Sequence, residues 1–409
     1  MTQKPPEAAP TEEATPGQFG LWGKEEKRDW PLIASGEARD ALTAFGIPVD
    51  AHIDWHSARP FSAVARLSTE DGQIRFLKRH HRALRNADAL EEEHRFIAHL
   101  ASRGLQVALP LSTQSGRTAF SRDAWCYECF PCLDGEDLYR DTMSWEPYRS
   151  SSDACEAGRA LAVFHDASAG WMAPSRAESP LVSSLCPFLH PEGPAEGLRE
   201  WIEQQPALSK AITRHVGIRQ LLALVTPLLD KARPWLADAT PHWGHGDWHG
   251  SNLVWRHEQG IDVVQAPFDF SMADRTSRHF DIAVALERSM IDWLHPTNPS
   301  DRTAPISPGR VDRSAEYEVQ HLHIDAFLRG YGSAYPLTQA DHAAIAAMLP
   351  LAHMTFACSE IWYYDTLVNA PALADTTWQT YLQDHSLWFM HGRGAALCAS
   401  IASGGGAEI

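Results

Sequence analysis

The sequence predicts an α+β protein in two parts: a small antiparallel β-sheet with one main helix, then a larger and mainly helical part. Three observations support this prediction. The dipeptide Asp71-Gly72, a strong hairpin signal, separates two short strand-like segments. One well-formed helical segment follows, and from about Asp134 onward helical spacing dominates. With 409 residues, 44% of them hydrophobic, the chain is long enough to form two cores.

The smaller part is expected over residues 19–130, after a disordered tail at 1–18 that is polar and rich in Pro and Glu. Alternating or apolar runs predict its strands, and spacings of three to four residues predict its helices. The expected elements are a helix at 36–45, strands at 63–67 and 73–78, a helix at 87–102, and strands at 107–111 and 119–130.

The larger part is expected over residues 131–400. Two short strands are expected within 242–274, in the middle of a helical region. The segment 296–308, rich in Pro, Ser and Thr, is expected to be a loop. The expected helices lie at 153–167, 198–202, 218–235 and 280–294, and between 316 and 397.

Composition limits the possible partners and the compartment. The formal net charge is −17, and no Lys/Arg run offers the cationic face that a nucleic-acid partner needs. An acidic chain favours neutral or cationic partners. No run of about 18 apolar residues predicts a membrane span, and the N-terminus does not resemble a secretory signal. Seven cysteines, an odd number, fit reduced thiols and a cytoplasmic location.

Three of the cysteines form the pattern Cys126-x-x-Cys129-x-x-Cys132, which could indicate a metal or iron–sulfur site. The surrounding segment 124–133 is apolar and aromatic, and no fourth ligand lies nearby in the sequence. We therefore interpret the segment as a buried strand in which the thiols pack as small hydrophobic groups.

One segment combines the residue types that phosphoryl transfer requires. It reads His245-Gly246-Asp247 and, five residues after Asp247, Asn252; a second carboxylate, Asp269, ends the strand-like run that follows. One carboxylate can orient and deprotonate a hydroxyl group, while a carboxamide and a second carboxylate can hold magnesium on phosphates.

This pattern, His-x-Asp-x-x-x-x-Asn followed by an Asp in Phe-Asp-Phe, resembles the aminoglycoside phosphotransferase and choline kinase superfamily, which is related to protein kinases. It is also similar to bacterial stress-response kinases and homoserine-kinase-like enzymes. The resemblance implies a two-lobed, protein-kinase-like fold that uses ATP and Mg²⁺. It implies that Asp247 is the catalytic base, that Asn252 and Asp269 hold the metal, and that His245 braces the loop. Asp281 would support the loop from a helix start.

The resemblance also implies a nucleotide site in the smaller part. Lys78 ends a strand, as the ATP-binding Lys of kinases does, and Glu93 on the following helix would be its partner. The backbone from Glu128 to Phe130 would contact the adenine. The phosphate-covering loop lacks the usual glycines, so two serines would contact phosphate there instead. These serines are Ser57 and Ser62.

A zinc site is a rival interpretation of the same loop, because His242, His245, Asp247 and His249 are potential ligands. Their spacing, His-x-x-His-x-Asp-x-His, does not match the metallo-β-lactamase pattern, and no His-Glu-x-x-His motif occurs in the sequence. We therefore favour the magnesium interpretation.

The acceptor is expected to be a small molecule with a hydroxyl group, of the aminoglycoside, amino-alcohol or sugar type, and a cationic acceptor would suit the acidic chain. The helical segment 356–365 mixes aromatic residues with carboxylates, and Glu360, Tyr364 and Asp365 are its candidate acceptor residues. Two alternatives remain: a stress-response-type Ser/Thr protein kinase and a nucleotide-binding protein without catalysis. Because only about a dozen residues separate Asp269 from Asp281, an activation loop is not expected, which favours a small acceptor.

Overall fold

The computed structural model describes residues 17–19, 25–47, 51–143, 145–176, 181–297 and 316–405. They form two compact units, which are described separately here. The sheet unit comprises the described residues up to Ala87 together with Pro110–Cys132, and the helical unit comprises Asp88–Leu109 and the chain from Leu133 onward. Residues 1–16 of the expected tail (1–18) and most of the expected loop at 296–308 lie outside the described residues.

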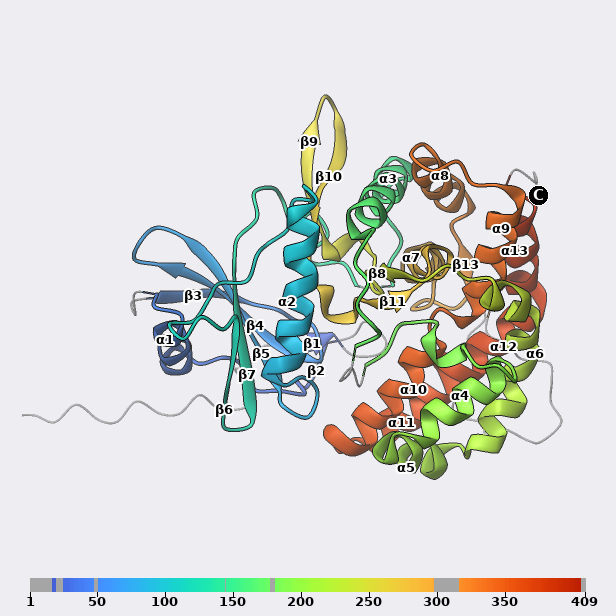
Figure 1. Cartoon of the computed structure of the whole chain (residues 1–409), viewed down its shortest axis with the longest axis horizontal. Helices are drawn as coiled ribbons and strands as arrows, with labels where there is room; N and C mark the ends of the chain where they lie inside the picture. Colours follow the sequence, from blue (N-terminus) through green and yellow to red (C-terminus); the bar gives the residue numbers. More distant parts are fainter. Residues whose placement is uncertain are drawn as a thin grey trace, which may run out of the picture. The chain divides into compact units, whose positions relative to one another are not determined.

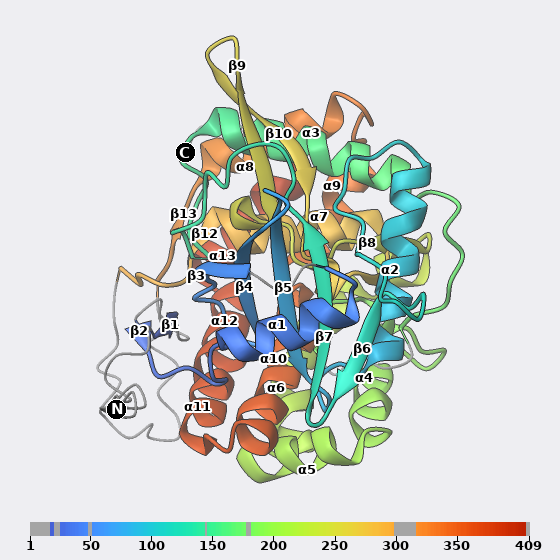
Figure 2. The ribbon, with the colours of Figure 1, turned by 90° about the vertical axis from the view of Figure 1, so that its left-hand side faces the viewer.

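The sheet unit contains a five-stranded antiparallel sheet in the order β3-β4-β5-β7-β6, crossed on one face by helix α1 (Figure 2). A two-stranded pair, β1 and β2, precedes it. The elements are β1 Gln18–Phe19, β2 Glu25–Glu26, α1 Ser35–Ala44, β3 Ala51–His56, β4 Ser62–Thr69, β5 Ile74–His81, β6 Ala119–Arg122 and β7 Trp125–Pro131.

The predicted hairpin around Asp71-Gly72 is present as β4–β5, with Ser68 opposite Ile74 and Gly72 at a φ of 75°. The expected strand at 119–130 is two strands, β6 and β7, because the chain reverses at Asp123, whose φ is 53°. The expected strand at 107–111 is wrong, since this segment has no regular structure. Strand β3 was missed.

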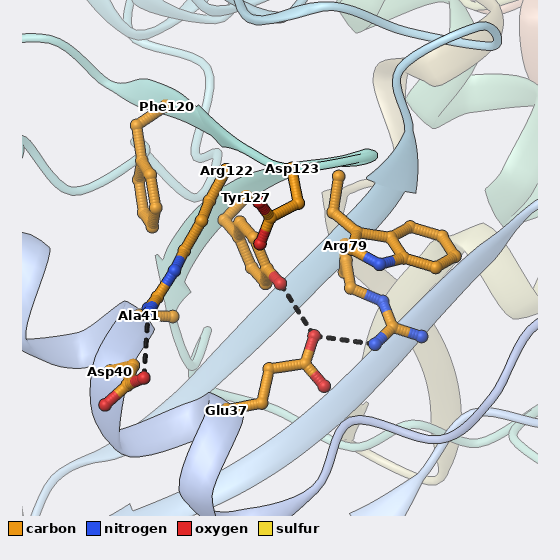
Figure 3. A pocket seen from close by; sticks show the side chains of 9 residues that line it. Glu37, Asp40, Ala41, Arg79, Phe120, Arg122, Asp123 and Tyr127 are labelled. Atoms are coloured by element: carbon orange, nitrogen blue, oxygen red, sulfur yellow. Dashed lines mark hydrogen bonds and ion pairs between the residues drawn. The ribbon is translucent and has the colours of Figure 1, made fainter.

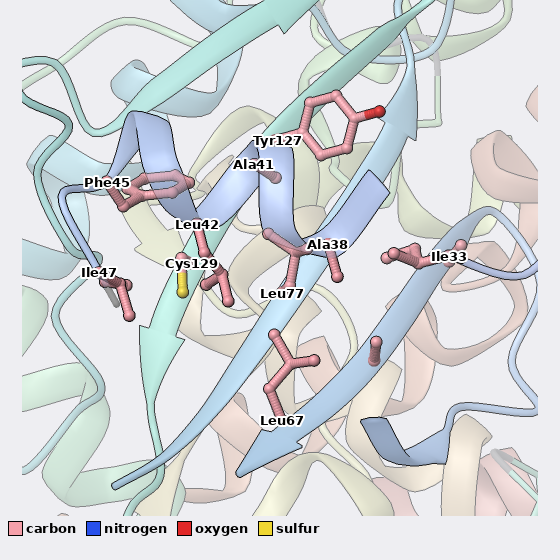
Figure 4. Close-up of a cluster of buried hydrophobic side chains, with 12 residues drawn as sticks. Ile33, Ala38, Ala41, Leu42, Phe45, Ile47, Leu67, Leu77, Tyr127 and Cys129 are labelled. Carbon is pink, nitrogen blue, oxygen red and sulfur yellow. The ribbon is translucent and has the colours of Figure 1, made fainter. Parts of the chain in front are cut away.

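The core of the sheet unit lies between the sheet and α1 (Figure 4). Ala41 and Leu42 lie about one turn after Ala38 on α1, and all three face the sheet, as the helical period requires. Leu67 and Leu77 meet them from β4 and β5, and both are fully buried. The alternation of side chains along β5 places Lys78 on the opposite face of the sheet from Leu77.

A second feature of the α1 face is an open pocket between α1 and the β6–β7 hairpin (Figure 3). Glu37 accepts hydrogen bonds there from Arg79 at 2.6 Å and from the Tyr127 hydroxyl at 2.7 Å. The Arg79 guanidinium also stacks on the Trp125 ring, 4.1 Å from its centroid. The polar side chains of this pocket are thus largely paired with one another, and they secure α1 to the sheet.

The helical unit consists of helices with short two-stranded pairs between them (Figure 1). Its strands pair as β8 with β11, β9 with β10, and β12 with β13. The helices are α2 Ala87–Ser102, α3 Ser151–Ser168, α4 Pro194–Glu203, α5 Pro206–His215, α6 Ile218–Ala237, α7 Arg278–Met290, α8 His321–Gly332, α9 Gln339–Met348, α10 Met354–Trp362, α11 Pro371–Thr376, α12 His385–Met390 and α13 Gly392–Ala402. The strands are β8 His242–Gly244, β9 Leu253–Glu258, β10 Ile261–Pro267, β11 Asp274–Thr276, β12 Ile291–Asp292 and β13 Glu318–Val319.

Helix α2 groups with the helical unit, although it was expected to belong to the sheet part. The reason is its packing. Phe96 on α2 lies 4.9 Å from the Trp243 ring and makes edge contacts with Phe164 and Phe270. These aromatic contacts bury the apolar face of α2 against the segments that flank the predicted catalytic loop.

The stretch Gln339–Leu367 is long and apolar enough to cross a membrane by composition alone. Within the helical unit, however, 89% of its most apolar window is buried. This is the burial expected of a central helix in a folded core.

Candidate active site

The segment with the predicted catalytic residues lies between β8 and β9 and is anchored by Asp281. The side chain of Asp281 accepts hydrogen bonds from the backbone N–H groups of His245 (2.9 Å) and Gly246 (2.8 Å). Ser277 caps α7 by accepting from the Phe280 N–H, which places Asp281 in the first helical turn. Asp281 thus lies where the sequence suggested a loop-supporting carboxylate.

A buried histidine completes this anchor. The His165 ring on α3 lies 2.9 Å from Asp281 through Nε2 and 2.8 Å from the Tyr331 hydroxyl through Nδ1. Burial alone would raise the pKa of Asp281, but the hydrogen bonds from His165 and from the two backbone amides lower it below its ordinary value. The carboxylate therefore stays ionised and holds the loop.

His245 lies behind the loop and connects it to the segment that carries Asp269. Its Nε2 is 3.0 Å from the Phe268 carbonyl oxygen, and its ring contacts Trp248 and Phe270. The side chain is fully buried, so it lies within the core and not at the surface of the loop.

Asp247 and Asn252 meet directly. The Asn252 side-chain amide donates to the Asp247 backbone oxygen (2.9 Å) and to its Oδ2 (3.1 Å), and His249 Nε2 lies 3.3 Å from the same Oδ2. Partial burial would raise the pKa of Asp247, but the nearby Arg288 and His249 lower it well below its ordinary value. Its side chain is 23% exposed, which leaves the carboxylate accessible.

The third predicted residue, Asp269, follows the β9–β10 hairpin. The Phe268 N–H donates to the Asn252 carbonyl at 3.0 Å, so the neighbour of Asp269 is bonded to Asn252. Asp269 has the left-handed backbone angles φ 56° and ψ 71°, and its side chain accepts from the Ser271 N–H at 3.4 Å. The structure thus brings Asp247, Asn252 and the Asp269 segment together.

These oxygen atoms form a suitable donor set for a hard divalent cation. The side-chain nitrogen of Asn252 donates to Asp247, so the side-chain oxygen Oδ1 of Asn252 can act as a metal ligand. Asp269 offers a carboxylate. Mg²⁺ prefers such oxygen ligands and completes its shell with water and phosphate. The chemistry of these residues therefore fits the metal that the sequence predicts.

The rival zinc interpretation is not supported by the placement of its histidines. His242 Nε2 lies 2.7 Å from the Ser168 hydroxyl, whereas His245 faces the Phe268 carbonyl. Among the described residues, no group of three His, Cys, Asp or Glu side chains has the arrangement of a metal site.

The nucleotide residues predicted for the sheet unit lie on three adjacent strands. Val64 on β4 and Glu128 on β7 flank Lys78 on β5 in register, so that these side chains share one face. Lys78 is buried, with 8% exposure. The Glu128 side chain binds His80 Nε2 at 2.8 Å; the predicted adenine contact uses backbone atoms and does not depend on this side chain.

The other predicted nucleotide residues lie at the edges of this face. Ser62 begins β4 and lies opposite His80, while the Ser57 hydroxyl accepts from the Arg59 N–H at 3.1 Å within the connection from β3 to β4. Phe130 on β7 lies opposite Phe76. Cys126 and Cys129 are buried and point to opposite faces of β7, whereas Cys132 follows the strand and is exposed.

Glu93, the predicted partner of Lys78, accepts from an arginine that sequence reasoning missed. Arg176 Nη2 lies 3.1 Å from Glu93 Oε2, and both side chains are buried. Arg176 also donates through Nη2 to the Ala89 carbonyl and through Nη1 to the Ser271 carbonyl, at 3.1 and 3.0 Å. It thereby connects α2 to the segment that follows Asp269.

A second group surrounds Asp247 on its other side, and of its members only Glu360 was predicted as a site residue. Arg288 Nε on α7 lies 3.0 Å from Asp247 Oδ1. Glu287 and Glu360 are buried nearby, and burial raises the pKa of Glu287 to about 7 and that of Glu360 to about 8. His353 lies 3.8 Å from a carboxylate oxygen of each. Glu287 follows Asp281 by six residues on α7, but nothing in the sequence marked it as a site residue.

The predicted acceptor residues do not form one group. Glu360 lies in the buried cluster near Arg288, but Asp365 pairs with His215 at 2.8 Å and Arg214 at 3.0 Å on α5. The sequence predicts a helical segment over 356–365, whereas the backbone becomes π-helical from Tyr363 to Leu367. Tyr364 is buried in this turn. Asp365 therefore lies apart from Glu360, and its role in binding the acceptor stays a prediction.

Comparisons with known proteins agree with the resemblance seen in the sequence. A family model described as "Phosphotransferase enzyme family" matches residues 59–310. An uncharacterized protein of Deinococcus radiodurans is 29% identical over 256 residues, or 61% of this chain and 60% of that protein. The chain thus matches less than two thirds of the length of this relative.

Solved structures show the fold. A spectinomycin phosphotransferase in complex with ADP and spectinomycin has a TM-score of 0.50 at 11% identity, covering 88% of this chain and 97% of that one. An amicoumacin kinase in complex with AMP-PNP, Ca²⁺ and Ami has a TM-score of 0.48 at 16% identity, covering 86% of this chain and 87% of that one. The predicted α+β, protein-kinase-like fold is confirmed.

Proposed function

Because this chain belongs to the phosphotransferase enzyme family, we propose that it transfers the γ-phosphoryl group of ATP to a hydroxyl group of a small molecule. The observation that carries the proposal is the convergence of Asp247, Asn252 and the Asp269 segment on one anchored loop. Phosphoryl transfer depends on positioning and charge stabilisation, and this loop supplies groups for both.

Asp247 would orient the hydroxyl group of the acceptor and accept its proton. The hydroxyl oxygen then forms a bond to the γ-phosphorus, the bond to the bridging oxygen of ADP breaks, and ADP leaves. Asn252 and Asp269 would hold Mg²⁺, which when bound neutralises charge on the β- and γ-phosphates. Lys78, buried on β5, is the predicted phosphate-binding lysine.

A small acceptor is favoured over a protein substrate by the segment between Asp269 and Asp281. Its residues are a short 3-10 turn at Phe270–Met272, the paired strand β11 and the helix cap Ser277. All of them belong to a turn, a strand or a helix cap, so the segment is too short to contain an activation loop. The net charge of −17 favours a neutral or cationic acceptor.

The test is a transfer assay with γ-labelled ATP and Mg²⁺ against pools of aminoglycosides, amino alcohols and sugars, with casein in a separate reaction. We expect label in a small molecule and no label in casein. Asp247→Asn should abolish transfer and retain ATP binding, while Asn252→Ala and Asp269→Ala should raise the Mg²⁺ concentration needed. Asp262→Asn, on β10 and paired only locally with His257, is the matched control.

Wild-type turnover in Asp247→Asn would contradict the assignment of the base. Labelling of casein with no labelled small molecule would instead support the protein-kinase alternative. ATP binding without transfer to any acceptor would support the non-catalytic alternative.

A further inference from the structure

Arg288 has an unusual setting for an arginine on a core helix. Only 3% of its surface is exposed, and it lies in the buried last turn of α7, seven residues after Asp281. Its Nε lies 3.0 Å from Asp247 Oδ1 but 3.8 Å from the carboxylate of its own neighbour, Glu287. The shorter distance identifies Asp247 as the main partner of the guanidinium.

Two aromatic rings hold the guanidinium in this place. Its central carbon lies 5.1 Å from the centroid of the Trp145 ring and 4.9 Å from that of Phe356 on α10. A planar guanidinium stacks on ring faces, whereas the ammonium of a lysine is a compact charge on a flexible stem. The rings therefore favour an arginine at this position, and a lysine would keep the charge without its fixed location.

The Asp247 carboxylate is thereby held from both sides. Asn252 and His249 approach Oδ2 at 3.1 and 3.3 Å, while Arg288 approaches Oδ1. The Arg288 N–H is not aligned for a hydrogen bond, so this contact is an ion pair. Arg288 must therefore act on Asp247 through the position of its positive charge.

We propose that Arg288 is a positioning residue that, together with Asn252, fixes the orientation of the Asp247 carboxylate toward the hydroxyl group of the acceptor. The inference rests on the proposed function, because it takes Asp247 as the base. It adds that the geometry of the base is set by α7 and by the two rings, and not by the catalytic loop alone.

A purely structural role, as a counter-ion for the buried acids, is the competing explanation. Glu287 and Glu360 are almost fully buried, and neither Glu287 oxygen nor Glu360 Oε2 has a hydrogen-bond partner among the described residues. Burial also keeps the pKa of His353 well below its ordinary value, so this ring does not supply a positive charge. A counter-ion role predicts lost stability with little change in the turnover of folded protein, whereas positioning predicts lost turnover in folded protein.

The experiment compares the full-length wild-type chain with Arg288→Lys, Arg288→Gly and Phe356→Leu. Turnover is measured with MgATP and the best acceptor of the transfer screen, and also as MgATP hydrolysis with water as the acceptor. Thermal unfolding and binding of MgADP report on the fold. Since misplacing a reacting group by about 1 Å can cost about 100-fold in rate, we expect kcat to fall roughly 10- to 100-fold in Arg288→Lys, with an unchanged KM for ATP.

Two further measurements separate positioning from structure. Added guanidinium ion should raise the kcat of Arg288→Gly and leave that of Asp247→Asn unchanged. A crystal structure of Arg288→Lys should show the Asp247 carboxylate rotated away from the Asn252 amide, whether or not an acceptor has been found. Phe356→Leu, which retains the arginine, should lower kcat less than Arg288→Lys does.

The proposal is overturned if Arg288→Lys retains wild-type kcat, or if its Asp247 carboxylate keeps the wild-type orientation. Should Arg288→Gly fail to fold, the kcat of Arg288→Lys and the orientation of its Asp247 carboxylate decide the test. If the wild-type chain transfers phosphate but Arg288→Lys is unimpaired, only this inference fails. If the wild-type chain turns over no ATP at all, the proposed function fails and the inference falls with it.

Discussion

The sharpest test of the catalytic loop is Gly246→Ala, because the chain provides a matched control. Gly246 has a φ of +74°, and a Cβ added there would lie 2.2 Å from the Met272 carbonyl oxygen. Gly260, in the β9–β10 turn, has a φ of +89°, but a Cβ there would meet nothing within 4 Å. The two substitutions therefore share the backbone strain and differ in the clash.

The expected magnitudes follow from this geometry. A left-handed backbone angle costs an alanine about 1–2 kcal/mol, so Gly260→Ala should lower the free energy of unfolding by that amount. In Gly246→Ala the Met272 contact must also open by about 0.8 Å to reach 3.0 Å, the practical lower limit for a Cβ. The loop would move and weaken the hydrogen bond from the Gly246 N–H to Asp281. We expect Gly246→Ala to lower the free energy of unfolding by about 3 kcal/mol or more.

Turnover should separate the two variants further. Asp247 follows Gly246 directly, and a displacement approaching 1 Å can reduce kcat by about 100-fold. Gly260→Ala should keep wild-type kcat. Urea unfolding measures the stability of each variant, and the transfer assay with MgATP measures kcat. Equal kcat values in the two variants, or equal losses of stability, would refute the reasoning.

Three more predictions address the anchor, the buried acids and the packing of the helical unit. Asp281→Asn should destabilise the chain by about 3 kcal/mol and lower kcat, because its amide group cannot accept both loop N–H groups; urea unfolding and the transfer assay check this. Glu360 has a pKa of about 8 when folded against 4.5 ordinarily, so the folded chain keeps a proton that the unfolded chain releases between these pH values. Wild-type stability should then fall as the pH rises, by up to about 1.4 kcal/mol per pH unit, and Glu360→Gln should gain relative stability from pH 5 to pH 8 in urea unfolding. Gly330→Ala on α8 would place a Cβ 1.9 Å from the Cys155 carbonyl oxygen and should lower the unfolding temperature, whereas Gly332→Ala meets nothing within 4 Å and should be neutral or up to about 1 kcal/mol stabilising.

Each of these predictions has a clear contradictory result. Unchanged stability and kcat in Asp281→Asn would show that the loop does not depend on this anchor. Parallel stability–pH curves for wild type and Glu360→Gln would show that the carboxyl is not protonated in the fold. Similar unfolding temperatures for Gly330→Ala and Gly332→Ala would show that α3 and α8 do not pack as closely as the structure indicates.

Features set by local spacing could be predicted from the sequence. The β4–β5 hairpin follows from Asp71-Gly72 between alternating segments, since a short turn fixes the register of its strands. The segment from His245 to Asn252 spans only eight residues, so its order along the chain already limits where Asp247 and Asn252 can point. The family resemblance then predicts the role of each residue.

Features set by long-range packing could not be predicted in this way. Glu93 meets Arg176 across 83 positions, and Asp365 meets Arg214 across 151. A charged residue in a sequence gives no sign of which distant partner burial will select, because a desolvated charge requires a partner but does not specify which one. The π-helical turn at Tyr363 likewise changed which side chains share a face.

The sequence by itself therefore determined the chemistry of this protein: a carboxylate, a carboxamide and a second carboxylate in an order that suits phosphoryl transfer. Only the tertiary structure decided what surrounds that chemistry, with Arg288 and its two rings on one side of Asp247 and Asn252 on the other. The physical reason is that backbone spacing is a local property, whereas burial and charge pairing depend on how distant helices pack together.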